Sequence, residues 1–101
     1  MFDYETGTAK EAMAQRIIAI RKAKKWSATF MAQAVGATPQ RWYMYEKGRS
    51  TPPTEVLAKI KQLTGATADF ILFGDTSGMP FELMNLIGNQ VSVAEVGVKR
   101  A

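Results

Sequence analysis

Apolar residues recur along the chain at the spacing of one helix face, and turn residues separate the stretches that carry them. In the first stretch, Met13, Ile17 and Ile20 follow one another at intervals of four and three residues. This spacing places their side chains on one side of a helix, which we predict over residues 9–24. Thr8 and Glu11 have the spacing of a capping box, with Thr8 as the predicted N-cap of that helix.

The same pattern predicts five further helices, whose ends are marked by residues that start or stop helices. They span residues 28–35, 39–47, 54–64, 68–73 and 80–87. Three of them follow a hydroxyl-bearing residue that suits an N-cap, namely Ser27, Thr38 and Thr67. Each of the five predicted helices is followed by a glycine, at positions 36, 48, 65, 74 and 88. The chain is therefore expected to be all-α, with five or six helices.

Two details of the pattern make sharper predictions. The helix over residues 54–64 is expected to bury one apolar stripe, formed by Val56, Leu57, Ile60 and Leu63. After Gly88 the pattern changes, because valines at positions 91, 93, 96 and 98 favour extended structure or a tail. The last helix is therefore expected to end at residue 87.

Composition narrows the possible functions. A chain of 101 residues fits one domain, and its 47% apolar and 22% charged content is typical of soluble globular proteins. The lack of cysteine and histidine removes disulfides, cysteine nucleophiles, the commonest general base and the commonest metal ligand. No apolar run is long enough to span a membrane, and the first residues do not resemble a signal peptide. We therefore expect a cytoplasmic protein that is not an enzyme and needs no cofactor, metal or small-molecule ligand.

The charge is distributed unevenly along the chain. Residues 16–61 hold ten basic residues and two acidic ones, a net charge of +8, whereas the rest of the chain holds three basic and seven acidic residues, a net charge of −4. A basic segment of this kind is typical of proteins that bind a polyanion such as nucleic acid. Charge alone leaves a second interpretation open, in which the segment is a solvated basic surface without a partner.

Residues 27–48 carry the most informative motif. Two short predicted helices are joined there by a tight turn at Gly36, and Ala32 stands in the middle of the first helix. A small residue at that position lets two helices cross closely at a steep angle. This arrangement is helix-turn-helix geometry, in which the second helix can enter the major groove of DNA.

Residues 16–74 resemble the Cro/C1 type of helix-turn-helix domain, also called the XRE family. Six elements carry the resemblance in the expected order: Trp26-Ser27, Met31-Ala32, Val35-Gly36-Ala37-Thr38, Tyr45-Glu46-Lys47-Gly48, Pro52-Pro53 and Ile71-Leu72-Phe73-Gly74. The resemblance implies a lambda-repressor-like fold, with residues 8–74 as the DNA-binding domain and residues 75–101 as a short C-terminal extension. Family members usually bind as dimers, and the extension is a candidate dimerisation segment.

The resemblance also implies roles by position. The residues placed to contact DNA are Thr38, Pro39, Gln40, Arg41, Tyr43, Met44, Lys47 and Arg49. Thr38 would cap the recognition helix and touch a phosphate, and the basic residues among them would lie near the DNA backbone. Arg21 and Glu46 match a pair that often joins the first helix to the end of the recognition helix.

The predicted recognition helix departs from the family pattern in its apolar residues. Pro39 and Met44 replace polar readers, which leaves Gln40 and Arg41 as the residues best suited to read bases. Trp42 and Tyr45, three residues apart, are expected to turn inward and pack in the core.

Two functions fit these observations. The first is a transcriptional regulator, in the simplest case a repressor that binds a palindromic operator in double-stranded DNA as a homodimer. The second is an antitoxin- or antirepressor-like protein-interaction module on the same scaffold, which the apolar run from Trp42 to Tyr45 in the predicted recognition helix suggests.

Overall fold

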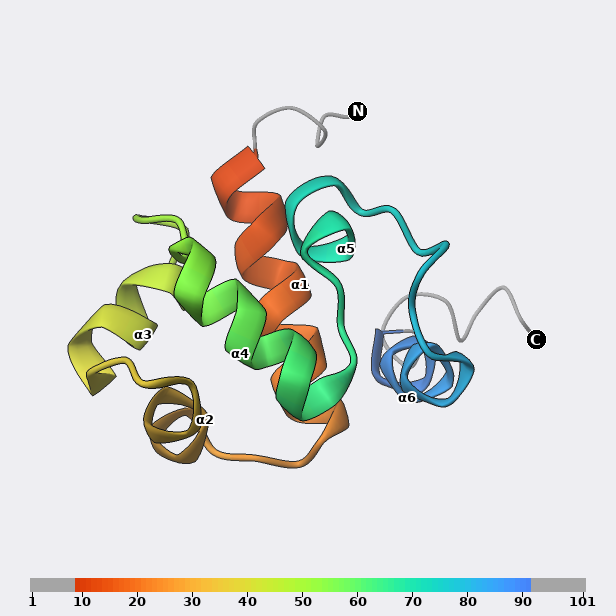
Figure 1. The fold of residues 1–101 in the computed structure, drawn as a ribbon, viewed down its shortest axis with the longest axis horizontal. Helices are drawn as coiled ribbons and strands as arrows, with labels where there is room; N and C mark the ends of the chain where they lie inside the picture. The colour runs from red at the N-terminus through yellow and green to blue at the C-terminus, as the bar shows by residue number, and fades with distance from the viewer. Residues whose placement is uncertain (1–8, 92–101) are drawn as a thin grey trace.

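The computed structural model describes residues 9–91, and these residues form six helices and no strand (Figure 1). The helices are α1 (Ala9–Ala23), α2 (Ala28–Val35), α3 (Pro39–Glu46), α4 (Thr54–Thr64), α5 (Ala68–Phe73) and α6 (Phe81–Val91). The predicted all-α class is confirmed. The predicted cap at Thr8 and the valines at positions 93, 96 and 98 lie outside the described residues.

The three N-caps predicted from hydroxyl-bearing residues are present. The side-chain oxygens of Ser27, Thr38 and Thr67 each accept a hydrogen bond from the backbone N–H three residues later, at 3.0, 3.1 and 3.0 Å. These bonds satisfy donors that a helix start leaves free. Gly36 ends α2 in the left-handed conformation, with φ 79° and ψ 23°, which a glycine adopts without steric cost.

Helix α1 runs through the middle of the molecule and packs most closely against α3, α5 and α6; α3 and α6 lie on opposite sides of it (Figure 1). Helix α2 packs against α3 and α4, which closes the domain on the remaining side. The largest fully buried side chains come from five helices: Ile17, Ile20, Met31, Trp42, Ile60 and Ile71. Leu83 and Ile87 of α6 belong to the same buried cluster, so α6 packs on the shared core.

The stripe predicted for α4 was wrong at its last position. Leu63 is 40% exposed, and Thr64 takes the buried place beside Ile60. The Thr64 hydroxyl donates to the Ile60 carbonyl at 2.8 Å and accepts from the Ala66 N–H at 3.0 Å. Because both hydrogen-bonding functions of the hydroxyl are satisfied inside the protein, its burial carries little penalty.

The predicted end of the last helix was also wrong. Helix α6 continues through the exposed Gly88 to Val91 and is not extended there. Glycine inside a helix costs about 1 kcal/mol relative to alanine, an amount that the burial of an Ile or Leu side chain exceeds. Leu83 and Ile87 are both buried, so packing on α1 stabilises the turns of α6 that lead into Gly88.

The segment between α5 and α6 is folded back on the end of α4. The sulfur of Met79 accepts a hydrogen bond from the Thr67 N–H at 3.3 Å, and a Cβ added at Gly65 would lie 2.7 Å from Cγ of Pro80. Asp75 accepts hydrogen bonds from the amide and hydroxyl of Ser77, which hold the pKa of Asp75 below its usual range. These contacts fix where α6 begins.

Candidate nucleic-acid interface

The turn between α2 and α3 is built as the sequence motif predicts. Met31, Ala32 and Val35 form the buried side of α2, with Ala32 fully inaccessible. After Gly36, the Ala37 N–H donates to the Ala32 carbonyl at 2.9 Å and closes the end of α2. The chain then enters α3 two residues later, so the turn places α3 directly against α2.

Helix α3 has two faces of different character. Trp42 and Tyr45 are 1% and 3% exposed and pack edge to face, with ring centroids 5.7 Å apart. Successive residues of a helix are turned by about 100°, so the residues opposite this pair form the outward face. They are Gln40, Tyr43, Met44 and Lys47, and all four are exposed. The predicted burial of Trp42 and Tyr45 is confirmed.

A polar clamp holds α3 against α1. Arg21 of α1 and Glu46 at the end of α3 form a bidentate ion pair, with Nε to Oε2 at 2.6 Å and Nη2 to Oε1 at 3.0 Å. The Trp42 indole N–H donates to Oε2 of the same carboxylate at 2.7 Å. Arg21 also donates through Nη1 to the Trp26 carbonyl at 3.1 Å, ahead of α2. One arginine therefore ties together α1, the approach to α2 and the end of α3.

The role of Trp42 in this clamp was not predicted from the sequence. Trp42 and Glu46 are four residues apart, as are Tyr43 and Lys47 on the outward face. Side chains at that spacing meet on a helix surface, so both pairs could have been predicted from the sequence. On the outward face, the Lys47 ammonium lies 5.4 Å from the centre of the Tyr43 ring, within cation–π distance.

The loop after α3 folds back onto the helix. The Arg49 and Ser50 N–H groups both donate to the Met44 carbonyl, at 2.9 and 3.3 Å. Gly48 has φ 72° and lies close to α1, where an added Cβ would be 3.4 Å from the Lys10 carbonyl oxygen. The loop therefore holds Arg49, which is exposed, at the C-terminal edge of α3.

Arg41 lies at the side of α3. It lines a hollow of about 310 Å³ together with the α2–α3 turn, including Thr38, and the start of α4, including Pro53 and Glu55. Gln40 and Arg41 were expected from the sequence to read bases, but only Gln40 belongs to the outward face defined above. Arg41 borders that face from the α4 side.

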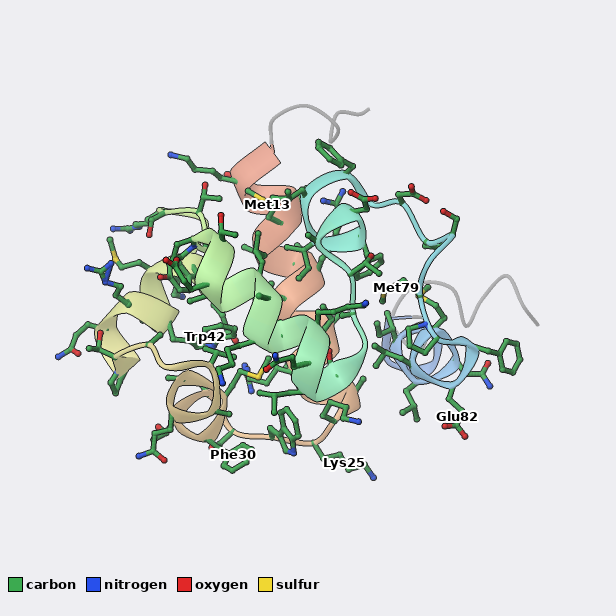
Figure 2. The ribbon with its side chains drawn as sticks, in the orientation of Figure 1. Met13, Lys25, Phe30, Trp42, Met79 and Glu82 are labelled. Carbon is green, nitrogen blue, oxygen red and sulfur yellow. The ribbon has the colours of Figure 1, made fainter. Side chains whose placement is uncertain are left out.

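An aromatic pair with one partly buried and one exposed member, Trp26 and Phe30, lies before and within α2. The rings of Trp26 and Phe30 are 5.1 Å apart, and Lys24 Nζ lies 5.8 Å from the Trp26 ring. Phe30 is 48% exposed and projects outward near Lys25 (Figure 2). This basic and aromatic surface is on the α1–α2 connection, beside the helix-turn-helix motif.

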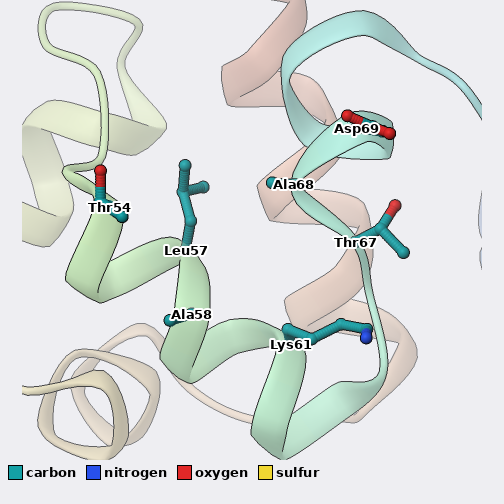
Figure 3. Close-up of a pocket in the computed structure, with 7 residues that line it drawn as sticks. All are labelled: Thr54, Leu57, Ala58, Lys61, Thr67, Ala68 and Asp69. Carbon is teal, nitrogen blue, oxygen red and sulfur yellow. The ribbon is translucent and has the colours of Figure 1, made fainter.

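A separate groove of about 390 Å³ runs between α4 and α5 (Figure 3). Its lining is mainly small or apolar, and Lys61 and Asp69 stand at its edges. It shares no lining residue with the hollow beside α3. Among residues 9–91, no group of acidic side chains is arranged to hold a metal ion, and no helix is long and apolar enough to cross a bilayer.

Residues 17–71, more than half of the chain, match the protein family described as Helix-turn-helix. The chain belongs to this helix-turn-helix family. The resemblance to Cro/C1-type domains and the lambda-repressor-like fold class are thereby confirmed, and membership supports DNA binding and transcription regulation as the class of function.

One curated relative is "SPbeta prophage-derived uncharacterized HTH-type transcriptional regulator YonR" of Bacillus subtilis (strain 168). It is 33% identical over 60 residues, which cover 59% of this chain and 56% of the relative. The chain therefore spans little more than half the length of that protein. No solved structure matches the chain.

Proposed function

We propose that the protein is a transcriptional repressor that binds a palindromic operator in double-stranded DNA as a homodimer. The observation that supports this most directly is the outward face of α3, which is exposed, carries Lys47, is bordered by Arg41 and Arg49, and is held in a fixed orientation by the Arg21–Glu46 pair. A helix presented in this way suits insertion into the major groove. Repression would follow from occupying a site that polymerase needs.

Within this proposal the eight candidate residues divide into two groups. Gln40, Tyr43 and Met44 lie on the outward face and would approach base edges. Thr38 and Pro39 at the helix start, with Arg41, Lys47 and Arg49, would contact the sugar–phosphate backbone. Contacts of the second kind position the protein without reading sequence.

Dimerisation is proposed through residues 75–101, of which residues 75–91 are described. Helix α6 exposes Phe81 and Leu86, at 80% and 42%, and Phe73 at the end of α5 is 73% exposed. Residues 62–91 contain no lysine or arginine. Exposed apolar side chains in a stretch without basic residues suit contact with a second protein subunit better than contact with DNA. Two subunits would read half-sites about 34 Å apart.

The DNA proposal is tested by selecting bound sites from a random duplex pool and measuring affinity for the enriched site at two salt concentrations. We expect a palindromic site whose binding weakens steeply with salt, because each neutralised phosphate contributes roughly 0.9 to the slope of log affinity against log salt. Failure to enrich any motif would contradict the proposal.

The dimer proposal is tested by sedimentation of the 101-residue chain that carries Phe81→Glu. We expect the variant to be monomeric at concentrations where the parent is dimeric. Leu63→Glu, which alters an exposed apolar residue of α4, serves as the control and should stay dimeric. A truncation at residue 74 is unsuitable, because it would remove Leu83 and Ile87 from the core.

A protein-interaction module remains the second candidate, because Tyr43 and Met44 are 55% and 37% exposed on the face that would read DNA. The two functions differ in their response to salt. A module that binds protein through these residues should show no salt-dependent binding to random duplex, whereas a DNA-binding regulator should.

A further inference from the structure

The middle of the outward face of α3 pairs an amide with a thioether. Gln40 and Met44 are four residues apart, both exposed, and directly opposite the buried Trp42 and Tyr45. Side chains at that spacing stand one above the other on a helix, about 6 Å apart along its axis. Together they form a short row at the part of α3 that would enter a groove first.

Cationic side chains lie beside this row, on α3 itself and on the loop after it. Lys47 is drawn toward the Tyr43 ring, with its ammonium 5.4 Å from the ring centre. Arg49 is held at the end of α3 by the hydrogen bond of its N–H to the Met44 carbonyl, and Arg41 lies over the hollow beside α4. Positive charge at the borders fits the two phosphate backbones of a groove, and the uncharged row fits the base edges between them.

The chemistry of the row matches one kind of base pair. A glutamine amide can bond N6 and N7 of adenine together, and the C5-methyl group of thymine is the apolar feature of the major groove. Guanine is usually read by arginine or lysine, and neither stands in this row. A separation of about 6 Å along the helix lets the two side chains reach neighbouring base pairs.

We propose that α3 recognises A·T base pairs, with the Gln40 amide bonded to adenine and the Met44 side chain packed on a thymine C5-methyl group. The inference rests on the proposed DNA binding and names the class of site: operator half-sites with at least one A·T pair in contact with α3. The apolar outward residues are then part of the reading surface.

The test uses the duplex enriched by selection and replaces its thymines with deoxyuridine, one at a time. This substitution removes the methyl group and leaves base pairing unchanged. At one thymine in each half-site we expect affinity to fall about fourfold, the loss that corresponds to one buried methyl-sized group. With Met44→Ala that loss should disappear, because no side chain remains to contact the methyl group.

The control variant is Gln62→Ala, an exposed residue in the last turn of α4, which should keep the full sensitivity to deoxyuridine. Circular dichroism verifies that Met44→Ala remains helical. Equal binding by every deoxyuridine duplex, or a loss that persists in Met44→Ala, would overturn the methyl contact while leaving DNA binding intact. If selection enriches no duplex at all, the proposed function fails first and the inference fails with it.

Discussion

Helices α3 and α6 both pack against α1, at opposite ends of the long axis of the molecule, and turn different chemistry outward (Figure 1). Inward, both are apolar: α3 buries Trp42 and Tyr45, and α6 buries Leu83 and Ile87. Outward, α3 belongs to the segment 16–61 with its net charge of +8, whereas residues 62–91 hold no basic residue and three acidic ones.

This difference shows which residues carry functional information. The inward faces obey the same packing rule, so they indicate that each helix belongs to the core and nothing about its partner. The outward faces differ in charge and hydrogen-bonding groups, which decide whether a surface meets phosphates or apolar side chains. Function in this chain is therefore expected to reside in side chains that contribute little to stability.

The largest effect should come from removing the inward anchor of α3. Trp42→Ala should lower the free energy of unfolding by about 3–5 kcal/mol, because it empties a site that is 1% exposed. Tyr43→Ala, the adjacent aromatic on the outward face, should change it by less than about 0.5 kcal/mol. Urea unfolding of both variants measures the contrast, and similar losses would contradict the assignment of the two faces.

Helix α6 allows the same comparison between a buried and an exposed residue. Ile87→Ala should cost about 2–4 kcal/mol, since Ile87 is 6% exposed and packs in the shared cluster. Leu86→Ala, one residue away and 42% exposed, should cost less than about 0.5 kcal/mol in the monomer. Both are measured by urea unfolding at a protein concentration below that at which the proposed dimer forms. If Ile87→Ala leaves the main transition unchanged, α6 is not part of the cooperative core.

The features predicted correctly from the sequence are those decided by near neighbours. The caps at Ser27, Thr38 and Thr67 depend on a hydroxyl and an N–H three residues away, so the neighbouring sequence is enough to predict them. The inward turn of Trp42 and Tyr45 follows from helix periodicity alone.

The features missed involve either an exchange between neighbouring residues or contacts between parts of the chain far apart in sequence. Leu63 was expected in the core, but the hydroxyl of Thr64 found two backbone partners and took the buried place. That Leu83 and Ile87 of α6 would join the core formed by the other helices could not be predicted from residues 80–91 alone. The position of Arg41 at the side of α3 follows from helix periodicity, whereas the hollow beside it could not be predicted, because the start of α4 forms its other wall.

The smallest effect on stability should come from removing the Trp42 indole N–H, which donates a hydrogen bond to Glu46 in the clamp. Trp42→Phe keeps an aromatic ring in place but removes the 2.7 Å hydrogen bond to Glu46, and should cost about 1–2 kcal/mol. Tyr43→Phe removes a hydroxyl from the exposed, outward side of the same helix and is the control, with a change near zero.

Because Glu46 remains paired with Arg21, Trp42→Phe should still fold fully, so its DNA binding can be compared directly. If the clamp orients α3, affinity for the selected duplex should fall while affinity for random duplex, which depends on phosphate contacts, stays the same. Equal loss on both duplexes would show that the indole N–H stabilises the fold without orienting the helix.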